Sequence, residues 1–439
     1  MRHAIVVGTC LDIELLRGRR YGLAMLGSTN ELIREIRRLL SGLRSTPYLN
    51  PSEGKNESRF EGGSGGVANG NGGMYVDVDD DLLFAVMHLA KATGIRNISR
   101  FSDPLKTPSV RLRVLFKPPI FLRRLQYLHL WGLSDTPSPS SEASLHLSKL
   151  EMLVVLKGGL QRVKAPGFAE ALHLFDIIES AKRLERPRFE LPPSSIEFLE
   201  RKMPTLRMAA ALTIQHARVG GEIHQHLSLN SALGEIFEDI QILCSWISTL
   251  VRLSPANFQG GHRDSSSGHM ASSEDVMVLR NLIEYRLLAY SPDPNNFVEN
   301  LMWTSAMIFT HGVIFPLPHP EPMKVLVRRL CDTLRGEGNH LGGPSQPRSF
   351  HPPYLTLDNR ILVWAATMGI MATSGSQAKE RAFFLESLGR YLGGSDVSTW
   401  TQLKSILQAY LWADWACDAG GCAIWEMLSV TTSTAAHGQ

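Results

Sequence analysis

Apolar residues recur three and four positions apart along most of this chain, and that spacing constrains its fold more than any other feature. The clearest case covers residues 231–253, where the apolar positions form one continuous stripe that predicts an amphipathic helix. Period-two alternation of apolar and polar residues, which is typical of half-buried strands, is nearly absent. The sequence therefore predicts an all-α fold. The stripe consists of Leu233, Ile236, Phe237, Ile240, Leu243, Cys244, Ile247, Leu250 and Val251.

The same spacing elsewhere predicts a multi-helix, bundle-like domain. With 439 residues and 44% hydrophobic content, the chain is long enough to bury a sizeable core. No fixed repeat period is present, which argues against a solenoid. The other predicted helices cover residues 28–42, 80–92, 145–163, 168–185, 196–217, 275–290, 297–313, 320–335, 358–373, 377–392 and 398–416.

Three segments interrupt this pattern with compositions that are typical of flexible, disordered insertions. Residues 50–75 contain the run GGSGGVANGNGG, residues near 255–275 are rich in Gly, Ser and His, and residues near 335–353 are rich in Gly and Pro. Such segments cannot bury enough apolar surface to order themselves. The predicted organisation is a basic helical segment at 1–49, the first insertion, an all-helical domain at 76–430 that contains the other two insertions, and a disordered tail at 431–439.

The overall net charge is too small for long-range electrostatic attraction to hold this protein on nucleic acid. The chain carries 45 basic and 42 acidic residues, a formal net charge of +3. The first 50 residues and residues 100–124 are locally basic, but apolar residues alternate with the charges. That pattern favours solvated helix faces over a nucleic-acid patch. We therefore expect no direct DNA binding by this chain.

Cysteine usage and the apolar runs predict an intracellular protein. The odd number of cysteines, five, forms no disulfide framework and indicates a reducing compartment. The apolar run at 4–11 is broken by Asp12 and Glu14 and lacks a cleavage site, which argues against a signal peptide. The longest apolar stretch, 301–315, contains His311 and ends at Pro316, so it is too short to span a bilayer. The cysteines stand at positions 10, 244, 331, 417 and 422.

Several short motifs match catalytic or metal sites only superficially. Residues 62–66, GGSGG, match the nucleophile-elbow pattern but lie in an insertion without the required strand and helix. His216, His224 and His226 have only Glu222 as a further nearby ligand type and match no standard metal spacing. Lys157 with Gly158 and Gly159 lacks the spacing of a phosphate loop, and the glycines more plausibly allow a bend or close helix packing after Leu156.

The run LWADWACDAGGCAIWEM, residues 411–427, concentrates tryptophans, cysteines and aspartates. Cys417 and Cys422 are five apart with no second pair, so we expect no zinc there. The run is better explained as the end of a buried helix that starts at Ser398 and is stopped by Gly420 and Gly421, with Trp425 beginning the return.

Two carboxylates in this run need a partner under that interpretation. Asp414 and Asp418 would lie near the negative end of the helix, where Arg381 or Arg390 could pair with them. Such a carboxylate pair can also serve as general acid and base, but structural pairing is favoured.

At this point the residues carry a family resemblance. The segment beginning ILVWAATMGIMATSGSQAKERAFFLESLGRYLG at residue 361, together with STWTQLKSILQAYLWADWACDAGGCAIWEM, resembles the C-terminal end of the regulatory domain in fungal binuclear zinc-cluster transcription factors. The order and spacing agree as well as the residue types. The matching residues are Trp364, Gly369, Arg381, Phe383, Phe384, Trp400, Leu403, Leu411, Trp412, Asp414, Cys417, Asp418 and Trp425.

A second block, residues 146–192, is similar to the middle stretch of the same family. There a helix runs into Gly-Gly-Leu, and the next helix carries an Asp before an Ala and a Pro-x-Phe. The preceding DDDLLFAVMHLAKATG fits the helix that usually stands upstream, so the resemblance extends from about residue 25 to residue 428. The matching residues are Gly158, Gly159, Leu160, Asp176, Ala181, Pro187 and Phe189.

The six-cysteine DNA-binding module of the family has no counterpart in this sequence. The resemblance therefore implies a regulator without its own zinc cluster, either a truncated or divergent member or the product of an incomplete gene model. It implies nuclear localisation, with the cytoplasm as alternative, and contacts with other transcriptional proteins. No cofactor, metal, catalytic residue or membrane association is expected.

Two other classes of function stay open at the level of sequence. A helical scaffold unrelated to transcription would gain support if the basic helix at 111–124 formed an exposed partner-binding groove. An enzyme would require Asp414, Asp418 or His311 to converge in a deep polar pocket.

Overall fold

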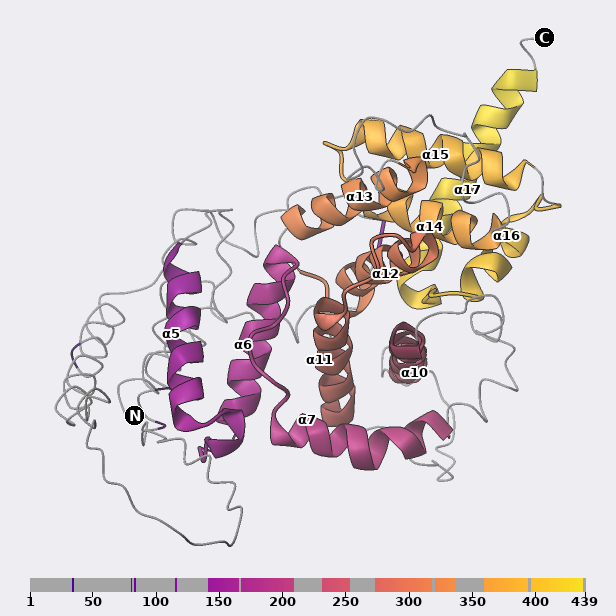
Figure 1. Cartoon of the computed structure of the whole chain (residues 1–439). Coiled ribbons are helices and arrows are strands. Elements are labelled where there is room, and N and C mark those ends of the chain that lie inside the picture. Colours follow the sequence, from indigo (N-terminus) through magenta and orange to yellow (C-terminus); the bar gives the residue numbers. More distant parts are fainter. Residues whose placement is uncertain are drawn as a thin grey trace, which may run out of the picture. The chain divides into compact units, whose positions relative to one another are not determined.

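The computed structural model describes residues 141–165, 167–208, 231–252, 273–317, 320–336, 359–393 and 396–436, together with Arg34, Asp80, Leu83, Leu115 and Phe116. Its described part is helical and contains no strand, which confirms the all-α fold (Figure 1). The chain divides into two compact units. Unit 1 is Met1–Arg100 with Ser138–Leu172, and unit 2 is Phe101–Pro137 with His173–Gln439.

The described helices follow the predicted order. They are α5 (Ser141–Lys157), α6 (Phe168–Arg183), α7 (Pro193–Glu197), α10 (Ser231–Arg252), α11 (Ser273–Ala289), α12 (Phe297–Phe309), α13 (Pro320–Arg335), α14 (Asn359–Ala372), α15 (Ala378–Leu392), α16 (Trp400–Gln408) and α17 (Asp414–Ala436). A 3-10 turn covers Leu160–Arg162, and π-helical turns cover Phe198–Lys202 and Thr310–Ile314.

Several predicted boundaries are wrong: α5 ends at Lys157 and not at residue 163, and two further differences lie nearer the C-terminus. The helix expected over 398–416 is interrupted, because residues 409–413 are not helical between α16 and α17. The first six residues of the predicted disordered tail, 431–436, are helical because α17 continues to Ala436. The insertion at 50–75, most of the insertions near 255–275 and 335–353, and most of the predicted helices at 28–42 and 80–92 lie outside the described residues.

In unit 1 a glycine pair ends α5 directly after Lys157, inside the helix that was predicted to continue to residue 163. Gly158 and Gly159 have φ of 93° and 97°, a region that favours glycine. Their N–H groups donate to the carbonyls of Val155 and Val154, both at 2.9 Å, which satisfies two of the last carbonyls of the helix. Of the two expected roles of this pair, a bend or close helix packing, the structure shows the bend, and a Cβ at Gly159 would contact nothing within 4 Å.

Asp80 fixes the chain that follows this bend. Its Oδ2 accepts hydrogen bonds from the backbone N–H groups of Lys164 at 2.7 Å and Ala165 at 2.8 Å. Its Oδ1 lies 2.7 Å from Lys157 Nζ. Partial burial works to raise the pKa of the Asp80 carboxyl, but Lys157 and the two amides outweigh it and lower that pKa. The residue is thus held ionised as a clamp across the turn.

In unit 2 the central element is α14. All residues from 361 to 372 are buried, and the helix packs against α12, α13, α15, α16 and α17 (Figure 1). The sequence explains this position, because the segment carries no charge and is apolar or small on every side. Gly369 lets the ring of Phe384 on α15 approach closely, since a Cβ at Gly369 would lie 2.6 Å from that ring.

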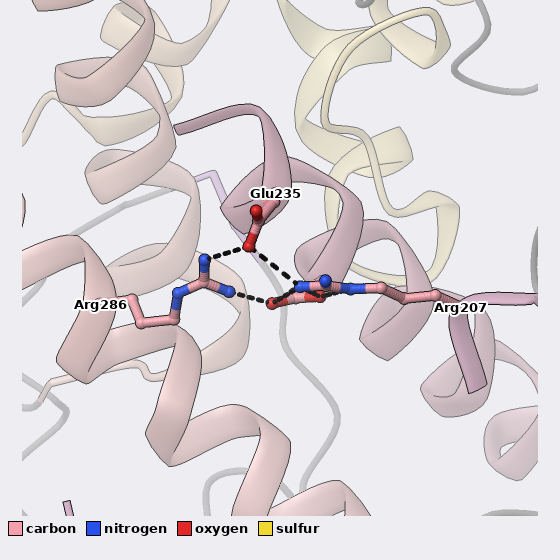
Figure 2. A network of polar contacts seen from close by, with 4 residues as sticks. Arg207, Glu235 and Arg286 are labelled. Carbon is pink, nitrogen blue, oxygen red and sulfur yellow. Dashed lines mark hydrogen bonds and ion pairs between the residues drawn. The ribbon is translucent and has the colours of Figure 1, made fainter. Parts of the chain in front are cut away.

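A polar network joins α10 and α11 to the helical residues 203–208, as Figure 2 shows. Asp239, buried on α10, accepts hydrogen bonds from Arg207 Nη2 at 2.9 Å and from Arg286 Nη1 at 2.5 Å. Glu235, one turn earlier, pairs with Arg286 at 2.8 Å. Burial raises the pKa of the Asp239 carboxyl, and the two arginines oppose that rise. The two guanidinium groups compensate the cost of burying this carboxylate.

Candidate functional site

Four of the residues predicted as family motifs, Trp400, Trp412, Asp414 and Asp418, meet where α16 gives way to α17. We call Lys404, Trp412, Asp414 and Asp418 the acidic junction. Lys404 Nζ lies 3.0 Å from Asp414 Oδ2 and 2.7 Å from Asp418 Oδ2. Partial burial opposes the charged ammonium, but the two carboxylates outweigh it and raise the pKa of Lys404. One lysine thus pairs with both aspartates.

Tryptophans connect the acidic junction to the core of unit 2. Trp412 Nε1 donates to Asp418 Oδ1 at 2.8 Å, and the Trp400 and Trp412 rings lie 6.1 Å apart between centroids. Trp364, fully buried on α14, donates from Nε1 to the Leu411 carbonyl at 3.1 Å. Its ring stacks on Tyr410 with centroids 5.4 Å apart. The non-helical residues 409–413 are therefore held by two hydrogen bonds, one from Trp364 to the Leu411 carbonyl and one from Trp412 to Asp418.

This geometry corrects the expected placement of the aspartates. Asp414 and Asp418 lie in the first and second turns of α17, so they face the positive end of a helix dipole, not the negative end. Their cationic partner is Lys404, whereas Arg390 pairs with Glu386 at 3.9 Å. Among the described contacts, Arg381 makes no ion pair with either aspartate.

Gly420 and Gly421 do not end a helix, because both lie inside α17. Their role is close packing. A Cβ at Gly420 would lie 2.7 Å from Leu115 Cβ and 2.7 Å from Met371 Sδ, and one at Gly421 would meet the rings of Trp400 and Trp412. Trp425 does not begin a return but continues α17, half-buried against the core.

Asp176 on α6 explains the spacing of the other family-like block within unit 2. The residue is fully buried, and its Oδ2 accepts from the backbone N–H groups of Arg188 at 2.7 Å and Phe189 at 2.9 Å. Ser180 Oγ lies 3.5 Å from its other oxygen. The carboxylate thereby fixes the chain that leaves α6. Trp364 and Asp176 thus hold backbone in place, whereas Trp412, Asp414 and Asp418 contact other side chains.

A second polar cluster lies deeper, and we call Arg280, Glu284 and His311 the buried charge cluster. His311 Nε2 and Glu284 Oε1 are 2.8 Å apart, with side-chain exposures of 2% and 0%. Arg280, one turn before Glu284, is also buried, and its Cζ lies 4.8 Å from the centroid of the Phe315 ring. Burial lowers the pKa of Arg280 to about 10, and Glu284 opposes that change.

The π-helical turn Thr310–Ile314 positions the histidine of this cluster. Such turns widen a helix locally and are frequent at functional sites. His311 Nδ1, Glu284 Oε2 and Arg280 Nη1 have no hydrogen-bond partner among the described residues. Buried polar atoms of this kind commonly bond internal water.

A carboxylate beside a histidine can orient a general base, but this pair lacks the rest of that apparatus. A triad needs a nucleophile within hydrogen-bond distance of the second ring nitrogen, and in the described chain Nδ1 of His311 contacts none. The pair is also enclosed, with Thr304, Ser305 and Thr310 of α12 and the π turn buried as well. The arrangement supports an internal structural role in which charges compensate each other.

Sequence reasoning singled out His311 but missed Arg280 and Glu284. The two stand four residues apart on α11, between the buried Leu279, Ile283 and Leu287. Charges at helical spacing within an otherwise apolar face were the available signal. His311 pairs with Glu284, whereas Asp414 and Asp418 pair with Lys404, and no described contact joins the histidine to the two aspartates.

The cysteines and histidines form no metal site in the part of the chain that the structure describes. No group of three His, Cys, Asp or Glu residues there is placed to hold an ion. Burial raises the pKa of the Cys417 thiol and raises the pKa of the Cys244 thiol to about 12, so both stay protonated. Protonated thiols are poor nucleophiles and poor metal ligands.

Other predicted candidates cannot be placed. His216, Glu222, His224 and His226, the GGSGG run and Cys10 lie outside the described residues. None of the described helices is long and apolar enough to cross a membrane. No protein-family model, curated protein or solved structure matches the sequence.

Proposed function

We propose that this chain is a regulatory domain of the fungal transcription-factor type, which works through protein contacts and without a zinc cluster of its own. We also propose that it is not an enzyme and that it acts in the nucleus with other transcriptional proteins. The cytoplasm is the alternative location.

The observation that supports the proposal most is that several family-like residues hold α14, α16 and α17 together around the non-helical residues 409–413. Trp364 binds the backbone at Leu411, Trp412 binds Asp418, and Lys404 bridges the aspartates. Residues that resemble a family motif and hold helices together are what a shared regulatory fold requires, because their contacts serve packing and not chemistry.

The described polar clusters favour a non-catalytic role. The acidic junction uses its carboxylates in ion pairs with Lys404, and the buried charge cluster is enclosed in the core. Neither combines a nucleophile, a base and an accessible cavity, which catalysis would need.

Tethering the full chain to a heterologous DNA-binding domain upstream of a reporter, in a fungal host, tests the proposal. We expect the fusion to change reporter transcription relative to the DNA-binding domain alone. Trp412→Ala, which breaks the acidic junction, should abolish the change. Glu386→Gln, which removes only an exposed pair with Arg390, should keep it.

A nuclear fusion that leaves reporter transcription unchanged would overturn the proposal. Cytoplasmic localisation of the tagged chain together with an inert fusion would favour the alternative, a helical scaffold unrelated to transcription.

A further inference from the structure

The outward face of α13 carries three exposed arginines that form no ion pair with the described residues. The helix packs on α12, α14 and α15 through its buried apolar residues, so its opposite side lies at the surface (Figure 1). The residues exposed on that side fall within roughly 120° around the axis of an α-helix. We call them the basic face: Val325, Arg328, Arg329, Asp332 and Arg335.

Arg329, at one edge of the basic face, is held over an aromatic ring without a counter-ion. Its Cζ lies 4.4 Å from the centroid of the Trp303 ring, and Trp303 Nε1 in turn donates to the Leu287 carbonyl at 2.9 Å. Arg329 Nη2 donates to a neutral acceptor, Asn300 Oδ1, at 3.2 Å. Partial burial lowers the pKa of Arg329, and no described carboxylate opposes that change. A carboxylate placed beside this guanidinium would therefore be bound more strongly than one beside a fully hydrated arginine.

Arg335, at the other edge of the basic face, is held in the same way. Its Cζ lies 4.6 Å from the centroid of the Phe383 ring on α15. A guanidinium that lies over a ring keeps its in-plane N–H groups available, so it can still form a bidentate pair with a carboxylate. Between the two edges lie Val325, which is 49% exposed, and Arg328, which makes no hydrogen bond or ion pair with the described residues.

Positive charge on the basic face is left uncompensated, in contrast to the polar networks inside unit 2. There Asp239 pairs with two arginines, and Glu284 opposes the effect of burial on Arg280. On the basic face three arginines stand against Asp332 alone, a net charge of +2. The neighbouring Lys324 and Glu321 add nothing to it, because they pair with each other at 2.6 Å.

We infer that the basic face of α13 is a docking surface for an acidic amphipathic helix of a partner protein. The partner's apolar stripe lies on Val325, and carboxylates on the two sides of that stripe pair with Arg329 and Arg335.

The arrangement of the basic face favours such a helix over a nucleic acid. Its two ring-held arginines lie at opposite edges, with an exposed apolar side chain between them. A phosphate backbone would find no partner in Val325 and would be repelled by Asp332. A helix with carboxylates only beside its apolar stripe meets each arginine and contacts Val325 as well. The inference goes beyond the proposed function, since docking of an acidic helix does not require a role in transcription.

Fluorescence anisotropy on the full chain tests the inference with a labelled synthetic helix that carries a leucine stripe and a row of glutamates along each side of it. We expect saturable binding that weakens about tenfold when Arg329→Gln and Arg335→Gln are combined, because two carboxylate pairs are lost. Val325→Ser should weaken binding about threefold without a change in charge. The matched control, Arg201→Gln with Arg390→Gln, removes two exposed arginines that already have carboxylate partners, and it should leave the affinity unchanged.

Circular dichroism and cooperative thermal unfolding establish that each variant is folded. If loss of the Trp303 contact prevents Arg329→Gln from folding, Arg328→Gln with Arg335→Gln takes its place. The same synthetic helix with glutamine for glutamate should not bind. No binding of the glutamate helix to wild type, or equal weakening by the control pair, overturns the inference. Binding of a labelled single-stranded oligonucleotide at equal or higher affinity, with the same dependence on Arg329 and Arg335, also overturns it, because the face would then be a nucleic-acid site.

Discussion

At the scale of single residues, the ring of His173 couples folding to pH. The residue is 3% exposed on α6, and neither ring nitrogen has a hydrogen-bond partner among the described residues. Its ring lies 5.1 Å from that of Tyr285. Burial lowers the pKa of His173 from 6.5 to about 4, since the charged imidazolium has no compensating partner there.

The folded protein should therefore lose stability on acidification. Between pH 6.5 and about 4 the unfolded chain binds a proton at His173 that the folded chain does not, so the free energy of unfolding falls as pH falls. The full loss from this group is roughly 3 kcal/mol. Chemical denaturation of wild type and His173→Gln across this range checks it. We expect a flatter pH dependence in the variant, and parallel curves would contradict the assignment.

Residue identity alone predicted part of the candidate site. Trp364, Trp412, Asp414 and Asp418 were singled out from sequence, and the structure joins them through the hydrogen bonds and ion pairs around residues 409–413. Lys404 was not predicted as the partner. The prediction assumed an uninterrupted helix through residue 416, which placed the two aspartates near its C-terminal end. Arg381 and Arg390 were then the cationic partners considered for them.

At the scale of elements, helical spacing predicted most helices closely. The predicted helix at 320–335 coincides with α13, and that at 231–253 ends one residue beyond α10. The break after α16 escaped prediction, because the buried residues Leu407, Tyr410 and Leu411 continue the apolar pattern across it. Pairs such as Glu284 with His311 also escaped, since packing and not spacing brings α11 to the π turn.

Close packing of α14 on α15 makes glycine necessary at one position and not at another. A Cβ at Gly369 would lie 2.6 Å from the fully buried Phe384 ring, whereas one at Gly389 on α15 would contact nothing within 4 Å. We expect Gly369→Ala to destabilise the protein by about 1–3 kcal/mol through overpacking. The matched control Gly389→Ala should stabilise by about 0.5–1 kcal/mol, because alanine restricts the unfolded chain. Thermal unfolding of both variants tests this expectation. Changes of the same sign in their unfolding temperatures would refute the packing argument.

At the scale of the whole molecule, unit 2 is organised around a helix that is buried on all sides. α14 contacts α12, α13, α15, α16 and α17, and the buried residues of α12 extend the same core. Opening of the peripheral helices therefore leaves α14 protected until the core itself is lost. Elements of this kind exchange their amide hydrogens at the rate of global unfolding.

Hydrogen exchange should reveal this hierarchy. We expect peptides covering residues 361–371 and 301–309 to exchange slowest, and residues 378–386 of α15, which has an exposed face, to exchange faster. Mass spectrometry of the full chain at a pH near neutrality provides the measurement. Equal protection of α14 and α15 would mean that the helices open together.

The late position of α14 has a consequence for biosynthesis. At roughly 5–20 residues per second, a ribosome needs about 5–20 s to travel from the end of α13 at Arg335 to the end of α17 at Ala436. During the first part of that interval, until α14 is complete at Ala372, the nascent chain presents the apolar faces of α12 and α13 that α14 will cover. The emerging polypeptide is thus a natural client for holding chaperones, and its yield in a heterologous host should depend on their supply.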